Sequence, residues 1–179
     1  MADNMWMRSI NQRKERTRKM LPKMKLEEKI KFGEDIIKQT LEQWGSEHVV
    51  VAWTGGKDST VLLWLVRNVC TKNKIGLPVC MFVDEGDVFE EIKLFVDQVA
   101  KKWKLRVSVA HNHDVSSKAV ELGDVIQVKE LNLKNRREIA KLGYTETSFE
   151  YWPESLVGNH LMKTAATNEW LKKIRLKYY

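Results

Sequence analysis

The chain has 179 residues, 43% of them hydrophobic, and a formal net charge of +7. This length suits one domain, and no apolar run reaches the roughly 18 residues that a membrane span needs. The N-terminus is polar and basic and has no apolar signal segment, so we expect a soluble, cytoplasmic protein that does not enter a membrane.

The positive charge is concentrated near the N-terminus. Residues 1–31 hold ten Lys or Arg and four Asp or Glu, which is six of the seven net positive charges. We therefore divide the chain into a basic N-terminal arm, residues 1–25, and a domain, residues 26–179. Such an arm can bind nucleic acid or an acidic partner, and a solvated helix is the simpler interpretation.

Helices and strands are expected to alternate in the first part of the domain. The first helix has apolar residues at helical spacing, the second is apolar nearly all round, and the strands are short, apolar runs typical of a buried parallel sheet. The elements are expected, in chain order, as a helix over 26–44, a strand over 48–53, a helix from about 58, a strand over 79–84, a helix over 85–103 and a strand over 105–111. This order predicts an α/β fold, a Rossmann-like three-layer α/β/α sandwich with a mostly parallel sheet.

The pattern is weaker beyond His111. Residues 125–131, "VIQVKEL", are expected as a strand, 135–142 as a short helix, and 143–158 have loop composition. The last segment is helical, with Met162, Ala166, Trp170 and Ile174 four residues apart.

No metal site is assigned. Cys70 and Cys80 are the only cysteines and lie in apolar runs without metal-ligand spacing, so reduced core thiols are expected. His111 and His113 could bind a metal, but spacing supplies no third ligand, and polar loop residues are the simpler interpretation.

The sequence Thr-Gly-Gly-Lys-Asp-Ser, residues 54–59, lies between the first strand and the second helix. Unpaired amides and the dipole of a helix N-terminus make an anion site there, and glycines let the backbone approach a ligand closely. Thr54 and Ser59 add hydroxyl groups, and Lys57 adds a cation. Asp58 separates the lysine from the serine, so this is not a Walker A loop, and no Gly-x-Gly-x-x-Gly occurs. The alternative without a ligand is a tight turn with Asp58 as a helix cap.

This loop resembles the Ser-Gly-Gly-x-Asp-Ser pyrophosphate loop (PP-loop) of the adenine nucleotide α-hydrolase-like superfamily. Within it, the chain is most similar to the phosphoadenosine phosphosulfate (PAPS) reductase family, which includes the small subunit of bacterial ATP sulfurylase. "FVDEGDVFEE" is similar to that family's Asp-Thr-Gly-x-x-Phe-x-Glu pattern at Asp84, Gly86, Phe89 and Glu91, with Glu85 replacing the threonine. "NHLMKTAATNEWLKK" resembles its Lys-Thr helix, and the resemblance covers roughly residues 28–175.

The resemblance implies a binding site for ATP or a related adenine nucleotide, adenosine phosphosulfate (APS) or PAPS. Asp84 and Gly86 would border the nucleoside, and Lys163 would contact an oxyanion. In nucleotidyl transfer, pyrophosphate leaves the α-phosphorus, the loop amides and the catalytic candidate Lys57 stabilise its charge, and Mg²⁺ bridges the phosphates. The second catalytic candidate, Asp58, would help to hold the metal or cap its helix. The residues that would hold the phosphates are Thr54, Gly55, Gly56, Lys57, Asp58 and Ser59.

Two parts of the family pattern have no counterpart in this sequence. The reductases use a C-terminal tail cysteine and, where an iron–sulfur cluster binds, further cysteines, so reductase chemistry by this chain alone is not expected. The strand with the arginine motif, which would flank the first strand, is also missing. Three explanations are open: the chain is a fragment, a second chain supplies the strand, or "VIQVKEL" covers the open edge. For a complete chain, we favour the last explanation or a homodimer.

Three functions follow from these observations. The first is an enzyme, or an enzyme domain, for adenylyl transfer or sulfonucleotide chemistry in sulfate assimilation. The second is a nucleic-acid-modifying PP-loop enzyme of the tRNA or DNA thiolation type, suggested by the basic arm. The third is a non-catalytic nucleotide-binding module, suggested by the missing arginine motif.

Overall fold

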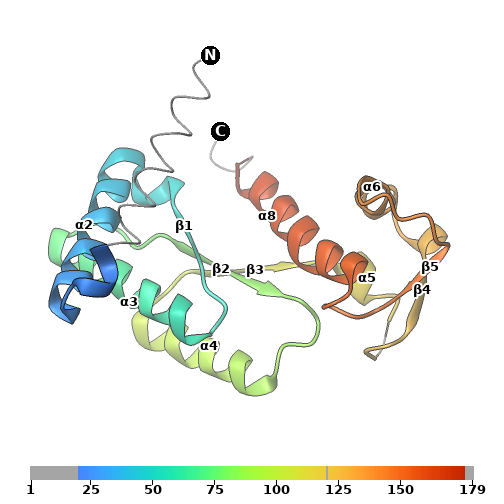
Figure 1. Cartoon of the computed structure of the whole chain (residues 1–179), viewed down its shortest axis with the longest axis horizontal. Helices are drawn as coiled ribbons and strands as arrows, with labels where there is room; N and C mark the ends of the chain where they lie inside the picture. Colours follow the sequence, from blue (N-terminus) through green and yellow to red (C-terminus); the bar gives the residue numbers. More distant parts are fainter. Residues whose placement is uncertain (1–19, 120, 176–179) are drawn as a thin grey trace, which may run out of the picture.

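A computed structural model describes residues 20–119 and 121–175 of the chain (Figure 1). Most of the basic arm lies outside these residues, and its described end contains the short 3-10 helix η1 (Leu21–Lys23). The structure therefore does not test the prediction that the arm binds nucleic acid. None of the helices in the described ranges is long and apolar enough to cross a membrane.

A three-stranded parallel sheet forms the centre of the fold. Its strands are β1 (Val50–Ala52), β2 (Val79–Asp84) and β3 (Val107–His111), in the order β1-β2-β3. Ala52 pairs with Met81, and Asp84 pairs with His111. All three strands were predicted from their apolar runs. Because the strands are parallel, the loops that follow β1 and β2 leave from the same edge of the sheet.

Helices lie on both faces of this sheet, so the predicted three-layer arrangement is confirmed (Figure 1). Helices α3 (Lys57–Asn73) and α4 (Glu90–Trp103) cover one face, and α2 (Leu26–Trp44) packs on α3, followed by the 3-10 turn η2 (Ser46–His48). Helix α8 (Ala166–Arg175) covers the other face, where buried Trp170 donates from Nε1 to Ser108 Oγ at 2.7 Å.

Several helix residues are more exposed than their spacing predicts. Helix α3 is not buried all round, because Val61, Leu62 and Trp64 are 58%, 44% and 40% exposed. Helix α2 leaves Leu26 and Trp44 exposed at its two ends. In the region predicted as the third helix, Phe89 and Phe95 are exposed and Val96 is the buried residue of α4. An apolar residue at helical spacing is buried only where another element covers it.

Residues 112–165 form a smaller unit beside the sheet, which we call the C-terminal lobe. Its two strands, β4 and β5, pair antiparallel, and its core contains Ile126, Phe149 and Leu161. Its elements are α5 (His113–Ser116), β4 (Val125–Gln127), the 3-10 turn η3 (Val128–Glu130), α6 (Leu133–Lys141), β5 (Ser148–Glu150), α7 (Leu156–Asn159) and the π-helix η4 (His160–Ala165).

This lobe corrects two predictions. Residues 125–131 do not fold back over β1, because Ile126 pairs with Phe149 of β5. Residues 143–158, expected as a loop, contain β5 and α7. In the described ranges β1 therefore remains an edge strand. A second copy of the chain beside it stays a prediction.

Candidate functional site

The Gly-Gly turn lies at the carboxyl end of β1, directly before α3. Trp53 continues the strand, since its amide donates to Met81 O at 2.9 Å. Its buried indole donates from Nε1 to Thr60 Oγ1 at 3.0 Å. This bond ties the end of the strand to the first turn of α3, so the turn between them is held at both ends.

Two hydroxyl groups hold the turn in shape. Ser59 Oγ donates to Gly56 O at 3.0 Å and lies 3.1 Å from Thr54 Oγ1. It also accepts from the Thr54 amide at 3.3 Å. The hydroxyl groups of Thr54 and Ser59, predicted to contact phosphate, thus bond mainly to the loop itself. The backbone is pre-organised before any ligand arrives.

The N-terminus of α3 is open. Its N-cap is Gly56, and no side chain caps it. Asp58 lies in the first turn and is exposed, so the interpretation of Asp58 as the helix cap is wrong. Lys57 is also exposed at the first helical position. The first amides of a helix have no intrahelical acceptor, and here they have no capping side chain either, which leaves an anion-binding end.

The two glycines of the turn have different roles. Gly55 has φ +77°, and a Cβ there would lie 2.8 Å from Ile92 Cγ2 and 3.1 Å from a methyl of Val96. Gly56 has an ordinary extended backbone, and the nearest atom to its Cβ would be Thr54 Oγ1 at 3.4 Å. Gly55 therefore lets the turn pack on α4, and Gly56 leaves open space in front of the helix.

A second loop leaves the sheet edge at the end of β2. Asp84 ends the strand, and its Oδ1 accepts from the Gly86 amide at 3.0 Å. Gly86 has φ +93°, a backbone conformation that favours glycine. Asp84 and Gly86, predicted to border a nucleoside, are thus brought together at the strand end next to the Gly-Gly turn.

His111 is fixed by hydrogen bonds from both ring nitrogens. Nδ1 lies 3.0 Å from Asp84 O, and because a carbonyl oxygen only accepts, Nδ1 carries the proton. Nε2 lies 2.7 Å from Ser116 Oγ, within hydrogen-bond distance. The His113 ring packs edge-on against His111 with 4.6 Å between centroids. Residues 20–119 and 121–175 contain no group of three His, Cys, Asp or Glu that could hold a metal.

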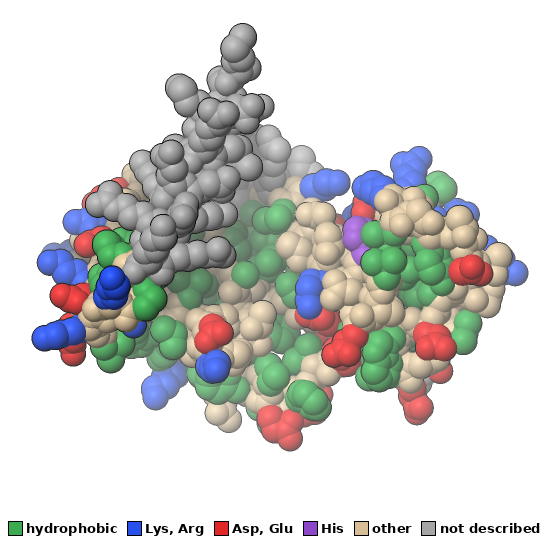
Figure 2. Space-filling view, viewed as in Figure 1, with side chains coloured by type: hydrophobic (Ala, Val, Ile, Leu, Met, Phe, Trp, Pro, Cys, Tyr) green, Lys and Arg blue, Asp and Glu red, His purple; other side chains and the backbone are tan. Residues whose placement is uncertain are grey.

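The C-terminal lobe reaches the loop after β2 through Lys163 and Tyr151. Lys163, on the π-helix η4, forms an ion pair with Glu85 at 3.0 Å. The candidate oxyanion contact is therefore paired with the residue that replaces the family's threonine. Basic and acidic side chains meet in the hollow between the lobe and the sheet (Figure 2).

Tyr151 is a site residue that the sequence did not indicate. It is 5% exposed, and a Cβ on Gly86 would lie 1.8 Å from its hydroxyl oxygen. Its burial, followed by the negative charges of Asp84 and Asp87, raises the pKa of the phenol above its ordinary value. The residue lies in a stretch of loop composition, where a lone tyrosine has no periodic signal to distinguish it.

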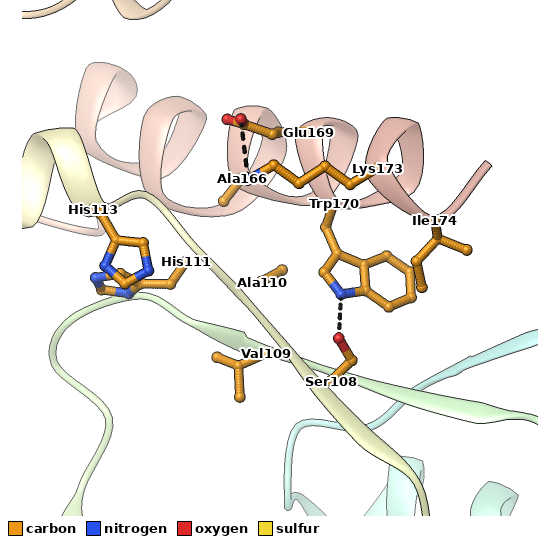
Figure 3. A pocket seen from close by; sticks show the side chains of 10 residues that line it. All are labelled: Ser108, Val109, Ala110, His111, His113, Ala166, Glu169, Trp170, Lys173 and Ile174. Atoms are coloured by element: carbon orange, nitrogen blue, oxygen red, sulfur yellow. Dashed lines mark hydrogen bonds and ion pairs between the residues drawn. The ribbon is translucent and has the colours of Figure 1, made fainter. Parts of the chain in front are cut away.

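A cavity of about 430 Å³ lies between β3 and α8 (Figure 3). His111 and His113 lie at one end and Trp170 at the other. Glu169, on α8, forms ion pairs with Lys134 and with Lys173, the latter at 3.4 Å. The charged groups here are satisfied by one another, and the cavity contains none of the residues of the Gly-Gly turn.

Comparison with known protein families gives a match to the phosphoadenosine phosphosulfate reductase domain over residues 48–178. The matched region begins just before β1 and includes all three parallel strands, both loops of the sheet edge and the C-terminal lobe. No curated protein matches the chain.

Proposed function

The chain belongs to the phosphoadenosine phosphosulfate reductase domain family, and we propose that it binds an adenine nucleotide by its phosphates at residues 54–59. ATP, APS and PAPS are the candidate ligands, and adenylyl transfer or sulfonucleotide chemistry is the proposed reaction class. The observation that carries this proposal is the uncapped N-terminus of α3, which follows a pre-organised Gly-Gly turn at the carboxyl end of a parallel strand.

The turn and the start of α3 offer the phosphates several donors. The amides at the start of α3 donate to phosphate oxygens, and the exposed Lys57 ammonium approaches from the first helical position. Gly56 leaves room for the phosphates to approach the backbone. Because these donors are fixed by the strand, the helix and the Ser59 hydroxyl, they would stabilise charge on a departing pyrophosphate without rearranging.

Asp58 is the residue proposed to hold magnesium. Mg²⁺ in nucleotide sites is bound by one or two carboxylates together with the phosphates, so a single exposed carboxylate beside the phosphate site fits it. When bound, the ion would neutralise phosphate charge. Asp58 itself would otherwise repel the phosphates, so nucleotide affinity should depend on the metal.

Titration calorimetry with ATP, APS and PAPS, each with and without Mg²⁺, tests the proposal. We expect binding of at least one nucleotide, a weaker affinity without Mg²⁺, and a loss of about tenfold or more in Lys57→Ala. Lys102→Ala is the matched control, because Lys102 is an exposed lysine in the last turn of α4. Failure of all three nucleotides to bind would refute the proposal.

A pyrophosphate exchange assay separates an enzyme from a non-catalytic binding module. Exchange of labelled pyrophosphate into ATP would show that the α-phosphorus is attacked reversibly. Binding without exchange, with candidate acceptors added, would favour the module. The binding proposal stands in either case, because it concerns the phosphate site and not the acceptor.

A further inference from the structure

The hydroxyl of Tyr151 is the strongest unexplained polar group in the described residues. The side chain is 5% exposed, and no hydrogen bond of its hydroxyl to another described residue is found. No fully enclosed side-chain oxygen or nitrogen lacks a partner in the described ranges, so this hydroxyl keeps some access to solvent. Buried tyrosine hydroxyls usually find a hydrogen-bond partner. This one has a nearly buried ring, and its hydroxyl lies against Gly86 without a hydrogen bond to a described residue.

The position of the hydroxyl is fixed by the loop after β2. A Cβ atom added to Gly86 would lie only 1.8 Å from the Tyr151 hydroxyl oxygen. The same Cβ would lie 3.4 Å from Met162 Cε. The pair Glu85–Lys163, at 3.0 Å, joins the same loop to the π-helix of the C-terminal lobe. Tyr151 is therefore held against the loop, and its orientation does not depend on a ligand.

The surroundings identify the kind of group that this hydroxyl can bind. The Asp84 carboxylate ends β2, where a carboxylate in nucleotide-binding α/β folds accepts a hydrogen bond from a ribose hydroxyl. Asp84 Oδ1 accepts from Gly86 N, and Oδ2 lies 3.6 Å from His111 Nδ1, so among the described residues Oδ2 has only this longer contact. The Tyr151 phenol lies against Gly86, whose amide donates to this carboxylate, and a phenol can both donate and accept, which suits a pair of neighbouring sugar hydroxyls.

We propose that Tyr151 binds the ribose of the nucleotide, together with Asp84, so that the C-terminal lobe supplies one wall of the nucleotide site. This inference rests on the proposed phosphate site of residues 54–59, which lies at the same sheet edge. It assigns the sugar to the loop after β2 and the phosphates to the turn after β1. The lobe thus helps to distinguish a nucleotide from free pyrophosphate.

Tyr151→Phe removes the hydroxyl and keeps the ring. Calorimetry of this variant with Mg²⁺-ATP and with Mg²⁺-pyrophosphate is the test. We expect ATP affinity to fall about threefold to tenfold, the range of one neutral hydrogen bond, and pyrophosphate affinity to stay unchanged. Tyr144→Phe is the matched control: its hydroxyl donates to Ser148 O at 2.7 Å within the lobe, so stability should fall and ATP affinity should not.

The 2′-deoxy and 3′-deoxy forms of ATP test the same contact without a variant. The unaltered protein should bind at least one of them more weakly than ATP, by a similar factor. Tyr151→Phe should lose that discrimination. If the unaltered protein binds ATP and pyrophosphate but Tyr151→Phe weakens neither, or weakens both equally, the ribose contact is refuted alone. If the unaltered protein binds neither ligand, the phosphate site fails and the ribose contact fails with it.

Discussion

Two loops leave the same edge of the sheet, and each contains a glycine with positive φ, but one is open and the other is covered. After β1, Gly55 packs on α4, and the helix N-terminus beyond it has no capping side chain. After β2, Gly86 lies under Tyr151, and Glu85 is paired with Lys163. The open loop leaves its donors to a ligand, whereas the covered loop finds its partners within the chain.

This difference shows that glycines in strand-end loops can have different structural roles. Gly86 and Gly55 are required because a Cβ would meet a side chain of a neighbouring element. A Cβ on Gly56 would contact no neighbouring element, so the absence of a side chain there keeps the space in front of the helix open. Substitution of each glycine should therefore separate folding from binding.

Gly86→Ala should have the largest effect of the changes considered. The new Cβ would meet the Tyr151 hydroxyl, and alanine is strained at φ +93°. We expect a loss of about 3 kcal/mol or more in the free energy of unfolding, measured by urea denaturation. Adding Tyr151→Phe removes the nearest atom, so the double variant should recover part of the loss. Strict additivity of the two changes would show that the hydroxyl does not cover this loop.

Gly55→Ala and Gly56→Ala test the open loop as a pair. At Gly55, positive φ and contact with Ile92 should cost about 2 kcal/mol of stability. At Gly56, stability should change by less than about 1 kcal/mol, but ATP affinity should fall because the methyl group occupies phosphate space. Thermal unfolding and calorimetry on both variants give the two quantities. If Gly56→Ala were unstable but bound ATP normally, Gly56 would be required for folding and not for phosphate binding, contrary to the prediction.

The sequence was sufficient to predict the open loop but not the covered one. The strand, turn and helix around residues 54–59 are contiguous, and their apolar runs and glycines specify them locally. Asp84 and Gly86 were also predicted, from the resemblance of residues 82–91 to the family's Asp-Thr-Gly pattern. Tyr151 follows β5, 65 positions further along the chain than Gly86, and its contact depends on the fold of the whole lobe.

The lobe itself was hard to predict for a physical reason. Its two strands have three residues each and pair only with each other. Strands this short contain too few residues to show a clear alternation of apolar and polar side chains. The apolar residues Ile126 and Phe149 were visible in the sequence, but their pairing was not, and covering the edge of β1 was one of the explanations favoured for residues 125–131. The exposed side of α3 was missed for a similar reason. Burial depends on neighbours that a local pattern does not contain.

Removing the Glu85–Lys163 pair should lower stability less than Gly86→Ala or Gly55→Ala does. The two side chains are 24% and 47% exposed, so solvent screens the attraction. We expect Lys163→Met to lower the free energy of unfolding by about 0.5 kcal/mol, an effect that shrinks in high salt. Lys141→Met serves as a comparison within the lobe. It breaks the ion pair between Lys141 and Glu138, and the Lys141 side chain is more exposed than that of Lys163. A loss well above that of a screened surface pair would mean that the ion pair anchors the lobe to the loop.

The alkaline behaviour of Tyr151 should be the smallest effect and the most specific to the covered loop. Burial and the charges of Asp84 and Asp87 raise the pKa of its phenol. Above about pH 10, the ordinary value, the unfolded chain loses this proton before the folded chain does. The unfolded state then binds fewer protons, so stability decreases as pH rises toward the raised pKa and is unaffected below pH 10.

Urea denaturation at stepped pH values from about 9 to 11 measures this slope. Buried Cys80, whose pKa is raised to about 11, and buried Cys70, whose pKa is also raised, contribute in the same direction, so the slope of the unaltered protein contains all three groups. The difference between the unaltered protein and Tyr151→Phe isolates the tyrosine, and Tyr144→Phe should keep the full slope. Identical slopes in all three proteins would mean that the Tyr151 phenol is not shielded by the loop. Bound ATP should steepen the difference, because a ligand contact to the protonated hydroxyl favours the neutral form further.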